Sequence, residues 1–102
     1  MQIGMIGLGR MGASMVTRLL RGGHACVVHD HNPQAAKPLV ELGATASDSL
    51  ADFVSALTAP RAIWLMVPAA VVDGVLDDLL PLLSPGDTVI DGGNSYYHDD
   101  LR

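Results

Sequence analysis

Short apolar runs and longer amphipathic stretches alternate along this chain. Five apolar runs have the length of a β-strand, and they cover residues 3–6, 25–30, 44–46, 62–67 and 88–91. The run at 62–67 is apolar throughout, which is typical of a central parallel strand that is covered on both faces. Segments rich in glycine, proline or small polar residues separate these runs from the amphipathic stretches.

The amphipathic stretches predict four helices, over residues 10–21, 32–42, 48–57 and 70–83. Gly22 and Gly23 end the first helix, Asn32 caps the second, and Ser47 caps the third. Pro38 lacks an amide hydrogen, so we expect the second helix to be kinked or to start late. The residues expected to face the core are Gly12, Val16, Leu19 and Leu20 in the first helix, Leu50, Phe53, Val54 and Leu57 in the third, and Val71, Val75, Leu79 and Leu82 in the fourth.

The regular alternation of strand and helix predicts an α/β fold with a doubly wound parallel sheet of the Rossmann type. Right-handed crossovers then place helices on both faces and give the strand order 3-2-1-4-5. In such sheets a ligand lies beyond the carboxyl ends of the strands, where the strand order reverses. The segments that follow the strands are therefore the places to look for a site.

The most informative of these segments follows the first strand and reads Gly7-Leu8-Gly9-Arg10-Met11-Gly12. Gly7 permits a sharp turn out of the strand, Gly9 lets a phosphate approach the backbone, and Gly12 lets the helix pack closely on the sheet. A pyrophosphate would then meet the free N–H groups at the helix start, where the helix dipole is positive. Arg10 either leans over the phosphates or faces solvent. A glycine-rich turn without any ligand is the alternative interpretation.

The second strand ends in Asp30, eighteen positions past Gly12. A carboxylate there can accept hydrogen bonds from the ribose diol of an adenosine and would repel a 2′-phosphate, which favours NAD over NADP. His29 and His31 flank this aspartate, and either of them could stack near the adenine or lie on the surface.

Composition narrows the class of protein further. The chain has 102 residues, is 49% hydrophobic and 17% charged, and has a net charge of −5, which predicts one globular domain without a basic face for nucleic acid. Cys26 is the single cysteine, so we expect a buried thiol and a reducing cytoplasm. We expect neither a signal peptide nor a membrane-spanning segment. No spacing indicates a metal site, and Asp77 and Asp78 fit a solvated helix face.

Three stretches together resemble the N-terminal part of the 6-phosphogluconate dehydrogenase family, within the broader β-hydroxyacid dehydrogenase superfamily. They are residues 6–12, the Trp64-Leu65-Met66-Val67-Pro68 run, and residues 81–95, which end in Asp91-Gly92-Gly93-Asn94-Ser95. The first stretch is shared by the superfamily, whereas the last is much more specific to the 6-phosphogluconate branch. The resemblance covers essentially the whole chain.

The resemblance implies a role for each matching position toward a nicotinamide cofactor. Residues 7–12 would wrap the pyrophosphate, and Asp30, His31 and Asn32 would select the adenosine ribose. Members that use NADP carry an Asn-Arg-Thr sequence there, and this chain lacks that arginine. Val67, Pro68 and Ala69 would pass under the ribose toward the nicotinamide, although Ala70 replaces a glycine that is frequent in the family. Asn94 would touch both the nicotinamide and the substrate.

The reaction of the family oxidises C3 of 6-phosphogluconate by hydride transfer and releases carbon dioxide to give ribulose 5-phosphate, a step of the pentose phosphate pathway. Its lysine base, glutamate acid and Ser-Gly-Gly substrate loop lie downstream of Asn94 in relatives, and Lys37 lies on the second predicted helix. The resemblance thus implies that residues 1–102 form a dinucleotide-binding domain truncated on its C-terminal side, the N-terminal fragment of a longer enzyme. It implies no catalytic residue in this fragment, which we expect to be inactive alone, and a homo-oligomer at full length.

Three other assignments stay open. A different β-hydroxyacid dehydrogenase, of the 3-hydroxyisobutyrate type, usually carries a serine-threonine pattern where this chain has Gly92-Gly93-Asn94. A non-catalytic nucleotide-sensing module would keep the cofactor site without the reaction. An FAD-binding domain usually has a glutamate in place of Asp30.

Overall fold

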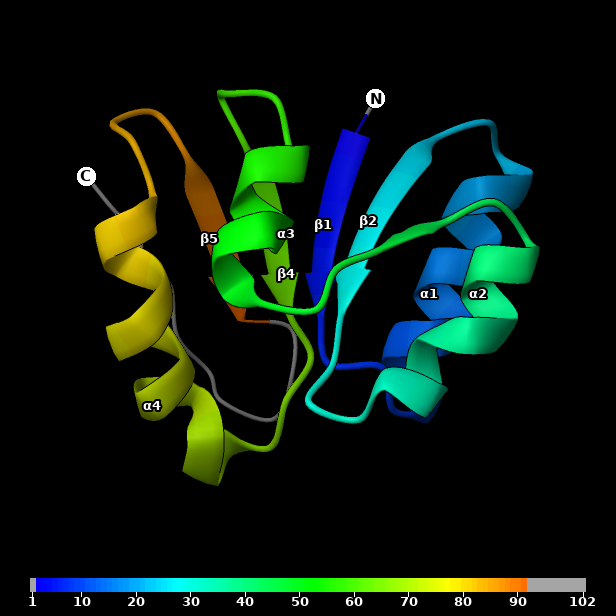
Figure 1. Cartoon of the computed structure of the whole chain (residues 1–102), viewed down its shortest axis with the longest axis horizontal. Helices are drawn as coiled ribbons and strands as arrows, with labels where there is room; N and C mark the ends of the chain where they lie inside the picture. Colours follow the sequence, from blue (N-terminus) through cyan, green and yellow to red (C-terminus); the bar gives the residue numbers. More distant parts are fainter. Residues whose placement is uncertain (1, 92–102) are drawn as a thin grey trace.

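The computed structural model of the chain describes residues 2–91, and Figure 1 shows how their helices and strands are arranged. The strands are β1 (Gln2–Ile6), β2 (Ala25–His29), β3 (Thr45–Ala46), β4 (Ala62–Leu65) and β5 (Thr88–Asp91). The α-helices are α1 (Arg10–Arg21), α2 (Lys37–Glu41), α3 (Leu50–Ala56) and α4 (Ala69–Leu79). Two short 3-10 helices, η1 (Pro33–Ala36) and η2 (Leu80–Leu82), precede α2 and follow α4.

All five strands run parallel in one sheet with the order β3-β2-β1-β4-β5. This confirms the predicted Rossmann topology. Ile6 at the end of β1 is in register with His29 of β2 and with Leu65 of β4. The carboxyl ends of the three central strands therefore lie side by side, along the lower edge of the sheet in Figure 1.

The helices form two layers, one on each face of the sheet (Figure 1). Phe53 of α3 and Leu79 of α4 belong to one buried cluster, and Val16 of α1 and Leu39 of α2 belong to the other. The strands supply both clusters by alternation, because successive side chains of a strand point to opposite faces. In β2, for example, Val27 joins the α3 and α4 cluster, whereas its neighbours Cys26 and Val28 join the other.

Two further predictions about the core hold. The expected inward positions of α1 and α3 are buried or partly buried in the two clusters. Cys26 is buried as expected, and this burial raises the pKa of its thiol. Gly4 explains how α3 approaches the sheet so closely, because a Cβ atom at this position would lie 2.7 Å from the Phe53 ring and 2.8 Å from Leu57.

The cap predicted for the third helix is wrong by two residues. Ser49, not Ser47, caps α3, and its hydroxyl accepts a hydrogen bond from the amide of Asp52 at 3.1 Å. The backbone of Ser47 is still bound to the sheet, because its amide donates to the carbonyl of Val28 at 3.1 Å. Ser49 is extended, with φ −138° and ψ 163°, so the helix begins at Leu50.

The apolar stripe predicted for the fourth helix is also partly wrong. Val72, Leu76 and Leu79 are buried, whereas Val71 is 46% and Leu82 is 37% exposed. Apolar residues occupy several faces of this segment, so its periodicity alone does not fix how the helix is rotated. The predicted helix also ends earlier as an α-helix, because its last turn is the 3-10 helix η2.

The segment predicted as one helix over residues 32–42 consists of η1 and α2, and the helical hydrogen-bond pattern changes just before Pro38. This agrees with the expectation that a proline inside the segment would interrupt it. The predicted cap is present, because Asn32 accepts a hydrogen bond from the amide of Gln34 at 3.1 Å.

A buried ion pair lies at the amino edge of the sheet. It is formed by Arg61, just before β4, and Asp87, just before β5. The Asp87 carboxylate accepts hydrogen bonds from the backbone amides of Arg61 at 2.7 Å and of Ser84 at 2.9 Å. It also accepts one from the Arg61 guanidinium at 2.9 Å, and that group donates to the Val54 carbonyl through Nε. Sequence analysis did not foresee this pair.

Candidate functional site

The glycine turn leaves the end of β1 in a conformation that only glycine adopts readily. Gly7 has a φ of +96°, and a Cβ atom there would lie 2.6 Å from the carbonyl oxygen of Met66. Both the left-handed backbone and the close neighbour require glycine at this position. The mechanical role predicted for Gly7 is therefore present in the structure.

Gly9 and Gly12 differ in what surrounds them. A Cβ atom on Gly12 would collide with the carbonyl oxygen of Gly7, so the close packing of α1 on the turn requires glycine. A Cβ atom on Gly9 would meet nothing within 4 Å, and the backbone there is ordinary, with φ −68°. The protein itself therefore does not require glycine at position 9, and open space lies above this part of the turn.

The start of α1 is left open toward the same space. Gly9 is the N-cap of the helix, so no side chain accepts the first free amide hydrogens, and the first turn contains no acidic residue. Arg10 and Met11 are exposed there, with Met11 66% exposed, whereas Leu8 is buried. Uncapped amides at the positive end of a 12-residue helix are a suitable binding place for an anion.

The carboxylate of Asp30 faces the glycine turn. Its Oδ2 accepts a hydrogen bond from the Leu8 amide at 2.6 Å, and its Oδ1 accepts one from the Asn32 amide at 2.9 Å. The imidazole of His31 lies 3.3 Å from Oδ1 but is otherwise exposed. Each carboxylate oxygen can accept more than one hydrogen bond, so Asp30 keeps capacity for a hydroxyl donor.

Backbone hydrogen bonds hold the segments after β1, β2 and β4 together at this edge. The Gly7 amide donates to the His29 carbonyl at 2.9 Å, and the Met66 amide donates to the Ile6 carbonyl at 2.8 Å. A Cβ atom on Gly7 would lie 2.9 Å from a methyl group of Val67, which places that half-buried side chain against the turn. The structure therefore brings together the segments that follow β1, β2 and β4, each of which was predicted to contribute to the site.

The remaining predicted positions fall at the edges of this group. Pro68 is exposed at the N-cap of α4, and Ala69 is the first residue of that helix. Asn94 lies outside the described residues, so its predicted position next to the substrate stays a prediction.

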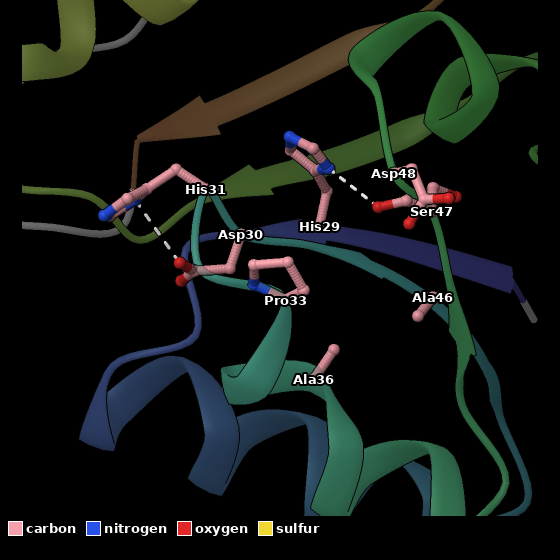
Figure 2. A pocket seen from close by; sticks show the side chains of 8 residues that line it. All are labelled: His29, Asp30, His31, Pro33, Ala36, Ala46, Ser47 and Asp48. Carbon is pink, nitrogen blue, oxygen red and sulfur yellow. Dashed lines mark hydrogen bonds and ion pairs between the residues drawn. The ribbon is translucent and has the colours of Figure 1, made fainter.

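A pocket of about 240 Å³ opens beside Asp30, between the segment after β2 and the segment after β3. Figure 2 shows its lining side chains, which are His29, Asp30, His31, Pro33, Ala36, Ala46, Ser47 and Asp48. Sequence analysis did not foresee Ser47 and Asp48 as part of a site. The predicted strand order contained the signal, because β3 neighbours β2 and the segments that follow the two strands must therefore meet at one edge.

The charges of the pocket suit a diol better than a phosphate. Two carboxylates, Asp30 and Asp48, line it, and none of its lining residues is a lysine or an arginine. Among the described residues, no group of three His, Cys, Asp or Glu side chains could hold a metal ion. The arrangement offers hydrogen-bond acceptors beside a helix start that attracts anions, which fits an adenosine ribose followed by a pyrophosphate.

A parallel sheet with this strand order, a glycine turn leading into a helix and an acidic residue after the second strand define the dinucleotide-binding class of Rossmann domains. Comparison with known proteins narrows the class to one family. Residues 2–102 match the family model described as the NAD binding domain of 6-phosphogluconate dehydrogenase, and the chain belongs to this family.

Relatives of known name agree with this family. The chain is 48% identical over its whole length to an NAD(+)-dependent, decarboxylating 6-phosphogluconate dehydrogenase of Haloferax volcanii. It is 42% identical, over 98% of its length, to a decarboxylating 6-phosphogluconate dehydrogenase of Treponema pallidum. The chain spans 34% of the first relative and 22% of the second.

Solved structures show the same fold. A 3-hydroxyisobutyrate dehydrogenase from Salmonella typhimurium matches 90% of the chain with a TM-score of 0.77 and 34% identity, and the match covers 32% of that protein. The 6-phosphogluconate dehydrogenase of Plasmodium falciparum matches 95% of the chain with a TM-score of 0.84. Its identity of 24%, over 22% of that protein, shows the fold alone. Within the described residues, no helix is long and apolar enough to cross a lipid bilayer.

Proposed function

We propose that this chain supplies the cofactor-binding domain of an enzyme that oxidises and decarboxylates 6-phosphogluconate to ribulose 5-phosphate, with NAD preferred over NADP. The observation that carries the cofactor preference is the Asp30 carboxylate, which faces the glycine turn and accepts the Leu8 amide at 2.6 Å. The Haloferax relative is named an NAD(+)-dependent enzyme, which supports the same preference.

In this proposal the residues of the chain bind and orient the cofactor. The α1 amides and the open space above Gly9 receive the pyrophosphate, and Asp30 accepts the ribose hydroxyls. His31 and Asn32 border the ribose, and Val67, Pro68 and Ala69 lead toward the nicotinamide half. Asn94 contacts both the nicotinamide and the substrate. The cofactor, when bound, accepts the hydride that leaves C3 of the sugar acid.

The proposal assigns the proton-transfer steps to residues outside this chain. Lys37 is the single lysine, and it is exposed at the start of α2, away from the pocket lining. We therefore expect residues 1–102 alone to show no turnover of 6-phosphogluconate with NAD. A clear rate above the uncatalysed background, measured as NADH absorbance, would contradict this assignment.

Calorimetric titration with NAD and with NADP tests the cofactor preference directly. We expect NAD to bind at least tenfold more tightly, because a 2′-phosphate beside Asp30 would meet a negative charge that no lining cation offsets. In Asp30→Asn the neutral amide should reduce this ratio toward one. Tighter binding of NADP by the unmodified chain would overturn the role given to Asp30.

A 3-hydroxyisobutyrate dehydrogenase type of enzyme is the second candidate, because a structure of that name matches the chain with 34% identity. The family model and the 48% identity to the Haloferax enzyme favour the first candidate. Activity of the whole enzyme on 6-phosphogluconate and on 3-hydroxyisobutyrate, measured side by side with NAD, separates the two.

We also propose that the whole enzyme acts in the cytoplasm as a homo-oligomer. The buried, unpaired thiol of Cys26 fits a reducing compartment. Light scattering of the whole enzyme after gel filtration tests the oligomeric state, and a monomer would contradict it.

A further inference from the structure

His29 is one of the residues that line the pocket, and its side chain has defined contacts. It is the last residue of β2, and its side chain points to the same face as Val27, toward α3. Nδ1 lies 3.0 Å from the carbonyl oxygen of Ser47, and the imidazole centroid lies 6.2 Å from that of the Phe53 ring, at an interplanar angle of 52°. Phe53 is fully buried, so the imidazole is held between a rigid aromatic ring and a backbone carbonyl.

The contact with Ser47 fixes the tautomer of the His29 ring. A carbonyl oxygen only accepts hydrogen bonds, so Nδ1 must carry the hydrogen in this pair. In the neutral ring Nε2 then has a free lone pair and acts as an acceptor. Figure 2 shows this second nitrogen turned away from Ser47. His29, whose ring carries this acceptor, lines the pocket together with Asp30.

We propose that His29 is a specificity-determining residue for the base of the dinucleotide, and that its Nε2 accepts a hydrogen bond from the exocyclic amino group of adenine. This inference rests on the proposed function, which places the adenosine end of NAD beside Asp30. The lining of the pocket supports it, because the ionised groups there, Asp30 and Asp48, are also acceptors. Adenine offers an amino donor to such a wall, whereas hypoxanthine offers a carbonyl oxygen that would meet another acceptor.

The pair NAD and nicotinamide hypoxanthine dinucleotide tests this inference, because the two differ only at C6, where a carbonyl replaces the amino group, and at the adjacent N1, which carries a hydrogen in hypoxanthine. We expect the chain to bind NAD about tenfold more tightly, the effect of one hydrogen bond in a partly buried site. Dissociation constants come from calorimetric titration of both dinucleotides in the same buffer. The readout is the ratio of the two constants, which a general loosening of the fold would not change selectively.

His29→Asn removes the acceptor at the position of Nε2, since the shorter asparagine side chain does not extend that far, but keeps an amide nitrogen close to the position of Nδ1, so that the hydrogen bond to Ser47 can remain. We expect it to bind both dinucleotides with nearly equal constants. If His29→Asn does not fold by circular dichroism, His29→Phe keeps a ring against Phe53 and provides the same comparison. His24→Asn is the matched control, because His24 precedes β2 at the opposite edge of the sheet, and it should keep the tenfold ratio.

The outcomes separate this inference from the proposed function. If the unmodified chain binds both dinucleotides equally, or if the ratio survives in the His29 variants, the role of His29 is overturned while NAD binding stands. If the chain binds neither dinucleotide, the proposed function fails and this inference fails with it. A tenfold ratio that is lost in the His29 variants and kept in His24→Asn supports the proposal.

Discussion

Two aspartates at opposite edges of the sheet make similar contacts but have different surroundings. Asp30 at the carboxyl edge accepts the amides of Leu8 and Asn32, and Asp87 at the amino edge accepts those of Arg61 and Ser84. Asp87 also pairs with the Arg61 guanidinium, and its side chain is only 1% exposed. Asp30 is 11% exposed, and the side-chain nitrogen next to it belongs to the solvent-exposed imidazole of His31, 3.3 Å away.

This difference separates folding from binding. The partners of Asp87 all belong to the protein and surround it on every side, so its charge contributes to the stability of the fold. Asp30 is oriented by the glycine turn but faces a pocket, so part of its hydrogen-bonding capacity remains for a ligand. Two amide hydrogen bonds to a carboxylate therefore do not tell whether it stabilises the fold or binds a ligand. Its remaining neighbours decide between these roles.

Removing the carboxylate at the amino edge should have the largest effect on stability. Asp87→Ala leaves the mostly buried Arg61 guanidinium and two amides without their acceptor, so we expect the free energy of unfolding to fall by about 3 kcal/mol. Urea denaturation followed by circular dichroism measures this change. Asp78→Ala, on the exposed face of α4, is the control and should change it by less than about 0.5 kcal/mol. Equal effects of the two variants would contradict the role of the buried pair.

Removing the carboxylate at the carboxyl edge should act on binding instead. We expect Asp30→Ala to weaken NAD binding by about 2 kcal/mol, because both the ribose acceptor and the group that orients the glycine turn are lost. Calorimetric titration gives the dissociation constant, and urea denaturation of the same variant should show a smaller loss of stability than Asp87→Ala. A variant that is strongly destabilised yet binds NAD normally would reverse the comparison.

Two glycines of the turn separate binding from stability in the same way, with smaller expected effects. Gly9→Ser adds a side chain where the protein leaves space, and serine is a good N-cap, so stability should stay within about 0.5 kcal/mol. NAD binding should weaken about tenfold, because the new atoms occupy the approach of the pyrophosphate. Gly12→Ala is the contrasting variant, since its Cβ atom would collide with the carbonyl of Gly7 and should destabilise the fold. Unchanged NAD binding by Gly9→Ser would remove the reason given for that glycine.

The smallest expected effect is a loss of folding stability at low pH. Burial raises the pKa of the Asp87 carboxyl, but the amides of Ser84 and Arg61 and the guanidinium of Arg61 together lower it more, so that it lies below its ordinary value of 3.8. A depressed pKa in the folded state adds stability that is present above the unfolded pKa and is lost as the pH falls through the folded pKa. We expect stability to decline below pH 3.8, with at most about 1.4 kcal/mol per pH unit from this group. Urea denaturation across this range should give a flatter profile for Asp87→Asn, and parallel profiles would argue against the assignment.

Much of the fold follows from the sequence because local and long-range signals agree. Apolar runs identified the strands, and their alternation with helices predicted the order that the sheet has. The position of Asp30 could be foreseen for the same reason, since a residue at a strand end is placed by the topology alone. The orientation of its carboxylate toward Leu8 is a tertiary contact across 22 positions, and it becomes visible only in the structure.

The errors arise where two residues compete for one role. Ser47 and Ser49 are both suitable caps by residue type, and only the structure shows that Ser49 caps the helix while the Ser47 amide bonds to Val28 in the sheet. Val71 and Val72 both fit an inward stripe, because the segment is apolar on several faces. The pairing of Arg61 with Asp87 spans 26 positions and has no local signal at all, since Asp87 alone is an ordinary turn residue.

The hydrogen bond between the Gly7 amide and the His29 carbonyl has one further consequence. It follows directly after the last paired residues of β1 and β2, and it connects the turn proposed for the phosphates to the residue proposed to contact the base. The backbone separation of these two segments is therefore set by the spacing of neighbouring strands, about 4.8 Å. In such a domain the strand spacing constrains which dinucleotide can fit, independently of the side chains that contact it.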